Sequence, residues 1–159
     1  MRSIPVKLPP FQQLLDVYGR DVQRFLVASL GPVEADDAYQ ETWVAALRAY
    51  PRLRDASNLR SWILTVAHRK AIDAVRTRGR RAVPVADVPE RGVLPEPLPD
   101  EGLWGEVRRL PPKQRTALAL RYVADAGYEE ISAVMGTSEE AARRNVHEAL
   151  KRLRTEYEA

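Results

Sequence analysis

The sequence lacks the residues on which many enzymes and secreted proteins depend. It contains no cysteine, which excludes thiol catalysis, cysteine-ligated zinc and disulfide bonds. Its two histidines, His68 and His147, lie far apart, so a histidine-rich metal site is not expected. Glycine is scarce at 8 residues, and no glycine-rich phosphate loop is present. No apolar run is long enough to cross a bilayer, and no signal-peptide pattern opens the chain. We therefore expect a cytoplasmic protein with no membrane insertion and no cofactor.

Proline and charge are distributed unevenly along the 159 residues. Five of the twelve prolines fall within residues 82–100, where acidic residues also outnumber basic ones. Because proline has a fixed φ and no amide proton, this stretch is predicted to be an extended acidic linker. It divides the chain into predicted domains at 1–81 and 101–159, each near the lower size limit for a domain.

The net charge of +3 is a sum in which the acidic stretch largely cancels two basic clusters on either side of it. The first cluster runs from Arg69 to Arg81 and holds six basic residues against one acid, Asp73. The second lies close to the C-terminus and includes Arg143, Arg144 and Lys151. Two separated basic surfaces favour a nucleic-acid partner.

The hydrophobic periodicity predicts an all-α fold with no useful strand pattern. Helices are expected from about Phe11 to Ser29, from 34 to 50, from 58 to 78, from 112 to 123 and from 128 to 135, followed by a last helix. The pair Gly31-Pro32 should end the first helix. In the second helix, the predicted buried stripe consists of Tyr39, Trp43, Ala46, Leu47 and Tyr50.

The segment from Tyr128 to His147 has the pattern of a helix-turn-helix. Gly136 stands where a helix end often needs positive φ, and Thr137 with Glu140 could form a capping box for the next helix. The outer face of that helix is basic. By helical spacing this face carries Glu140, Arg144, His147 and Lys151, with Arg143 and Arg154 beside it. The alternative is an ordinary helical hairpin with a solvated charged face.

The helix predicted at 58–78 has a second face that combines aromatic, hydroxyl and guanidinium groups. Arginine can neutralise phosphate, and an aromatic plane can stack on an unpaired base. The residues at helical spacing on this face are Trp62, Thr65, Arg69, Asp73 and Arg76. The alternative is that Trp62 belongs to the core and the arginines are merely solvated.

These segments together resemble a bacterial sigma factor of the small, extracytoplasmic-function (ECF) type. DDAYQETWVAALRAYPRL (36–53) and NLRSWILTVAHRKAIDAVRTR (58–78) are similar to sigma region 2. LPPKQRTALALRYVADAGYEEISAVMGTS (110–138) and VHEALKRLR (146–154) are similar to region 4. The resemblance spans nearly the whole chain, from about Phe11 to Arg154.

The resemblance implies a promoter-specificity subunit rather than an enzyme. Its expected partners are core RNA polymerase, promoter DNA as a melted −10 and a duplex −35 element, and an anti-sigma factor. The implied polymerase-binding residues are Asp37, Gln40, Glu41 and Arg48. The implied −10 residues are Asn58, Arg60, Trp62, Thr65, Arg69 and Arg76. The implied −35 residues are Arg143, Arg144, His147 and Lys151 on the last helix, with Ser138 near a phosphate.

Two other hypotheses stay open at the level of sequence. A stand-alone helix-turn-helix regulator would need only the C-terminal segment, together with a dimer interface for which no sustained heptads are present. A helical adaptor without a nucleic-acid partner would leave both basic clusters without a role. An enzyme is the weakest class, because no nucleophile–base pair or metal-binding group can be named.

Overall fold

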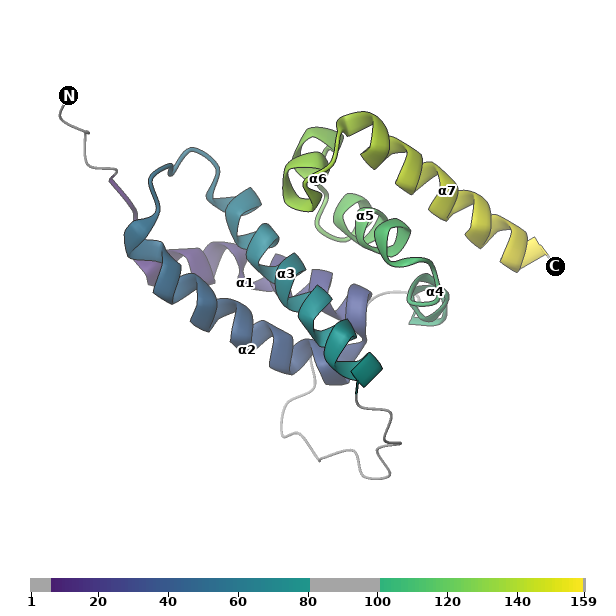
Figure 1. Cartoon of the computed structure of the whole chain (residues 1–159), viewed down its shortest axis with the longest axis horizontal. Helices are drawn as coiled ribbons and strands as arrows, with labels where there is room; N and C mark the ends of the chain where they lie inside the picture. The colour runs from purple at the N-terminus through teal and green to yellow at the C-terminus, as the bar shows by residue number, and fades with distance from the viewer. Residues whose placement is uncertain (1–6, 81–100, 159) are drawn as a thin grey trace.

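The computed structural model describes residues 7–80 and 101–158, and every regular element in these ranges is helical (Figure 1). The N-terminal domain contains α1 (Phe11–Leu30), α2 (Pro32–Ala49), a 3-10 turn (Tyr50–Arg52) and α3 (Leu59–Arg80). The C-terminal domain contains α4 (Glu101–Val107), α5 (Pro112–Tyr122), α6 (Tyr128–Met135) and α7 (Glu139–Glu158). The predicted all-α class with two helical domains is confirmed, whereas the predicted linker at 82–100 lies outside the described residues.

Local signals set most of the helix ends. Gly31 adopts a φ of +86°, and its amide donates to the carbonyl of Val27, which closes α1. Pro32 then opens α2, two residues before the predicted start, because proline suits the first helical position. The helix α4 was not predicted from the sequence. Its apolar residues Leu103, Trp104 and Val107 pack against the core, but seven residues are too few to show a clear period.

An aromatic cluster fills the end of the N-terminal domain where α1, α2 and the start of α3 meet. The ring of Phe11 packs edge-on against Trp43 and Tyr50, at centroid distances of 5.8 and 5.2 Å. The hydroxyl of Tyr50 donates to the carbonyl of Pro9 and fixes the segment that precedes α1. The predicted α2 stripe is wrong for Leu47, whose side chain is 55% exposed. Trp43, Ala46 and Tyr50 are buried in the core as predicted.

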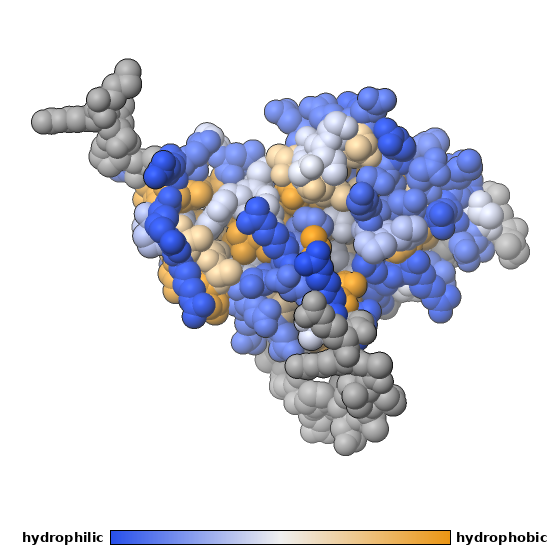
Figure 2. Space-filling model, viewed as in Figure 1, coloured by the Kyte–Doolittle hydropathy of each residue, from blue (hydrophilic) through white to orange (hydrophobic). Residues whose placement is uncertain are grey.

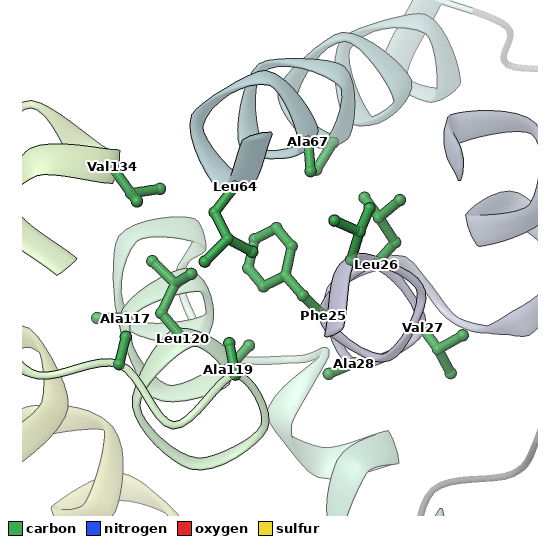
Figure 3. Close-up of a cluster of buried hydrophobic side chains, with 14 of the residues drawn as sticks. Phe25, Leu26, Val27, Ala28, Leu64, Ala67, Ala117, Ala119, Leu120 and Val134 are labelled. Carbon is green, nitrogen blue, oxygen red and sulfur yellow. The ribbon is translucent and has the colours of Figure 1, made fainter. Parts of the chain in front are cut away.

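The two domains share one buried core instead of being separate (Figure 3). Phe25 of α1 and Leu64 of α3 face Leu120 of α5 and Val134 of α6, and all four are at most 3% exposed. We call these four residues the interdomain core. Burying each side chain of this size stabilises the fold by roughly 1.5–3 kcal/mol. The packing of α3 on α6 is therefore part of the fold and not a loose contact.

A second contact joins the domains at the end of α1. Arg108, which follows α4, lies over Gly31 and donates to the carbonyl of Val27 at 3.4 Å. A guanidinium at this place also meets the negative end of the α1 dipole. The carbonyl of Arg108 in turn accepts a hydrogen bond from Arg115 of α5 at 2.9 Å.

Leu64→Ala should lower the free energy of unfolding by about 2–5 kcal/mol, because it opens a cavity in the interdomain core. The loss is measured by urea unfolding followed by circular dichroism. Leu47→Ala is the matched control, since its side chain is 55% exposed and its loss should stay within about 0.5 kcal/mol. Equal effects of the two substitutions would contradict the assignment of Leu64 to the core.

His68 should make the stability pH-dependent. It lines a cavity of about 410 Å³ between α3 and residues of α1, α5 and α6. Burial and the nearby charge of Arg69 lower its pKa from the usual 6.5. The unfolded chain therefore binds more protons than the folded protein just below pH 6.5, and stability should decline as the pH falls through this range.

Urea unfolding at about pH 7.5 and about pH 5.5 measures this decline. His68→Gln should flatten it. His147→Gln, which changes an exposed histidine, should leave it in place. If both variants keep the slope of the unchanged protein, His68 is not its source.

Candidate nucleic-acid and polymerase interfaces

The helix-turn-helix consists of α6, a tight turn and α7. Gly136 is left-handed with a φ of +66°, as expected, and this conformation turns the chain sharply after α6. The predicted cap is wrong by one residue. The amide of Ala141 donates to Ser138 Oγ at 3.0 Å, whereas Thr137 Oγ1 donates to the carbonyl of Ser138. Since α7 begins at Glu139, Ser138 holds the capping position and Glu140 lies one place too early to complete a capping box with it.

The structure brings the predicted −35 residues together on the exposed side of α7. Its opposite side is buried and consists of Ala142, Val146, Ala149 and Leu153. All five candidates are exposed: Ser138, Arg143, Arg144, His147 and Lys151. Figure 2 shows the surface over α7 as almost entirely hydrophilic. The helix thus presents the cations Arg143, Arg144 and Lys151 to the solvent, with the acids Glu139 and Glu140 exposed in its first turn.

Tyr128, at the start of α6, holds one of these cations in place. The guanidinium of Arg143 lies 4.5 Å from the centre of the Tyr128 ring, and that of Arg121 lies 5.4 Å from it. Such contacts contribute about 0.5–1 kcal/mol at exposed sites. Tyr128 was not among the predicted contact residues, because no local pattern links residues on either side of the turn.

On α3, the structure places most of the predicted −10 residues along one side of the helix. Asn58 caps the helix, since its side-chain oxygen accepts the amide of Ser61 at 3.1 Å. Trp62 is half-buried and lies 6.1 Å from the ring of Tyr50, so it is in part a core residue. Thr65 donates to the carbonyl of Ser61 at 2.7 Å. Further along, Arg69 and Arg76 are exposed.

Arg60 differs from the other predicted −10 residues, because it points toward the C-terminal domain. Its Nη1 donates to Asp21 at 2.8 Å and its Nε to Glu130 at 3.1 Å. Its Nη2 donates to the backbone carbonyl of Ala124. The neighbouring hydroxyl of Ser61 donates to the second oxygen of Glu130 at 2.9 Å. We call Arg60, Asp21, Ser61 and Glu130 the Arg60 cluster.

A third exposed surface lies on α2. The four predicted polymerase-binding residues, Asp37, Gln40, Glu41 and Arg48, are all exposed. Val44 and Leu47, which are 50% and 55% exposed, lie on the same side of the helix. Hydrophobic patches are visible among hydrophilic residues in the region of Figure 2 that corresponds to α2. Charged groups around exposed aliphatic side chains are typical of a protein–protein interface.

Two further findings concern the described ranges. Within residues 7–80 and 101–158, no group of three or more histidine, aspartate or glutamate side chains is placed to hold a metal ion. In the same ranges, no helix has the length and apolar character needed to span a membrane.

Comparison with known proteins identifies the two domains. The family described as Sigma-70 region 2 matches residues 14–81, and Sigma-70, region 4 matches residues 102–153. The ECF RNA polymerase sigma factor SigD of Mycobacterium tuberculosis is 35% identical, over 91% of this chain and 76% of its own length. SigM of Bacillus subtilis is 29% identical, over 91% of this chain and 93% of its own.

Solved structures share the fold. The sigma factor RpoE, in complex with the anti-sigma factor NepR from Bartonella quintana, superposes with a TM-score of 0.75 and 22% identity, over 93% of this chain and 96% of that chain. CnrH, in complex with the cytosolic domain of CnrY, gives a TM-score of 0.67 and 21% identity, over 93% of this chain and 87% of its own. At these identities the likeness concerns the fold.

A helical fold over the described residues, with a helix-turn-helix and a second basic helix, defines the class of DNA-binding transcription factors. The chain is a member of the ECF group of the sigma-70 family. It is a sigma factor for promoter-specific initiation of transcription, and its two regions bind core RNA polymerase and promoter DNA. The family consists of transcription initiation factors and not of classical enzymes.

Proposed function

We propose that the two domains divide promoter recognition between them, with residues 1–81 and 101–159 as the units and 82–100 as the connection. The N-terminal domain would bind core polymerase through α2 and hold the melted −10 strand along α3. The C-terminal domain would bind the duplex −35 element through α7. The observation that carries this proposal is that three helices each present a separate exposed face suited to one of these ligands.

The α2 face supports the polymerase contact through its mixed character. Asp37 and Glu41 supply negative charge, Arg48 supplies a cation, and Val44 with Leu47 supplies apolar area. Apolar groups at the centre of an interface give affinity, while the surrounding charges fix its orientation. Among the residues that the structure describes, Val44 and Leu47 are two large aliphatic side chains exposed one helical turn apart.

The α7 face supports binding to duplex DNA. An α-helix fits the major groove, and arginine or lysine can donate two hydrogen bonds to guanine. Arg144, His147 and Lys151 lie at helical spacing on the exposed side, and Arg143 is held by Tyr128. Ser138 caps the helix at its positive end, where a phosphate would also be favoured.

The α3 side supports capture of an unpaired strand. Trp62 is anchored by Tyr50 yet keeps part of its ring accessible, which suits stacking with a base. Arg69 and Arg76 are exposed further along the helix and could neutralise phosphates. Asn58, Thr65 and Arg60 complete the proposed −10 set.

We infer that an anti-sigma factor regulates this chain, as the complex of RpoE with NepR suggests by analogy. We also infer that the protein works in the cytoplasm, where polymerase and chromosome are found, and that it performs recognition without catalysis.

Initiation from a promoter in the presence of core RNA polymerase tests the proposal. The purified protein should bind core polymerase and start transcription at specific sites. Glu41→Lys should weaken core binding by about tenfold or more, because it reverses a charge in the interface. Glu156→Lys, an exposed acid on α7, is the control and should bind core as before. Absence of core binding by the unchanged, folded protein would refute the proposal.

Arg144→Ala and Arg69→Ala should each weaken promoter use by about 1–3 kcal/mol if the side chain contacts a base. Arg144→Ala should reduce binding of the upstream duplex, measured with a −35 fragment. Arg69→Ala should reduce melting, measured by permanganate reactivity of the −10 region. Should both variants leave promoter use unchanged, the assignment of these two helices is wrong.

A further inference from the structure

The Arg60 cluster engages in protein contacts a residue to which the proposed function assigns a role in binding the −10 strand. All three nitrogen atoms of the Arg60 guanidinium donate to protein acceptors, namely Asp21, Glu130 and the carbonyl of Ala124. The cluster thus engages three of the five N–H groups of this guanidinium, one on each nitrogen atom, and orients the side chain toward protein acceptors.

Glu130 joins the two domains through both of its carboxylate oxygens. One accepts from Arg60 at 3.1 Å and the other from Ser61 at 2.9 Å. The side chains of Arg60 and Glu130 are only 27% and 18% exposed. Solvent and salt screen a partly buried pair less than a surface pair, so this contact is stronger than an ordinary surface ion pair.

The geometry ties this contact to the packing of α6 against α3. The interdomain core lies one turn further along α3, where Leu64 meets Leu120 and Val134 (Figure 3). The helix-turn-helix thus lies directly on the helix proposed to bind the −10 element. Two DNA elements about two helical turns, or roughly 70 Å, apart cannot both be contacted in this arrangement.

We propose that Glu130 is an autoinhibitory residue, which holds the domains closed by occupying Arg60 and Ser61. The closed state engages Arg60 in contacts with protein acceptors in place of DNA and prevents the two domains from spanning a promoter. Opening breaks the contacts of Glu130 with Arg60 and Ser61 and uncovers Leu64. This inference rests on the proposed roles of α3 and α7. It adds a regulatory contact between them that belongs to the chain itself.

The absence of cysteine permits a direct test, because a single introduced thiol reports exposure of one site. Val134→Cys places a thiol in the interdomain core, and its rate of reaction with iodoacetamide measures how often the domains separate. Val146→Cys places a thiol on α7, which packs against α4, α5 and α6. It reports unfolding of the C-terminal domain and not separation of the domains.

Glu130→Gln should accelerate labelling of the Val134→Cys protein about tenfold, as expected for the loss of a charge-assisted contact. It should leave labelling of the Val146→Cys protein unchanged. Glu129→Gln is the matched control, since Glu129 is an exposed acid in the same first turn of α6. It should alter neither rate.

Two labelling results would overturn the proposal. One is an unchanged rate at Val134→Cys when Glu130→Gln is introduced. The other is equal acceleration at both thiols, which would mean that Glu130 stabilises the C-terminal domain itself.

Transcription with limiting sigma factor tests the inhibitory consequence. Glu130→Gln should increase initiation relative to both the unchanged protein and Glu129→Gln. Faster labelling without more initiation would refute inhibition. If none of the proteins initiates or binds core polymerase, the proposed function fails, whereas the labelling rates still decide whether Glu130 holds the domains together.

Discussion

Phe25 and Leu64 meet Leu120 and Val134 where the two helical domains join, and the presentation of every other surface depends on this contact. Small helical domains bury too little apolar area to be very stable alone. A shared core increases the apolar area that both domains bury, but it also places α6 against α3. The exposed faces of α2 and α7 are left free, while part of α3 is covered.

The helix α3 consequently serves two purposes that compete. One side supplies Ile63, Leu64 and Ala67 to the core, and another carries Trp62, Thr65 and Arg69, the proposed contacts with an unpaired strand. Arg60 lies on the core side, where partial burial of a guanidinium is unfavourable unless acceptors surround it. Glu130 and Asp21 meet that need in the closed arrangement, and DNA phosphates would meet it in an open one.

Much of the candidate site was predictable because helical periodicity tells exposed from buried residues. The polar candidates on α2 and α7 are exposed as expected, and the left-handed Gly136 stands at the predicted turn. The errors arose where periodicity is ambiguous. Leu47 is apolar and lies between the buried and exposed sides of α2, so its residue type suggested burial. Thr137 and Ser138 are both capable caps, and only the backbone geometry selects Ser138.

The sequence by itself determined most of the helices and the approximate positions of their ends, because proline, glycine and capping residues act on the few residues around them. It also determined the family, through segments spread over both domains. The tertiary structure alone decided that Arg60 meets Glu130, 70 positions away, and that Tyr128 holds Arg143. Such pairs depend on how whole helices pack, and the packing is set by the shapes of buried side chains that no local pattern records.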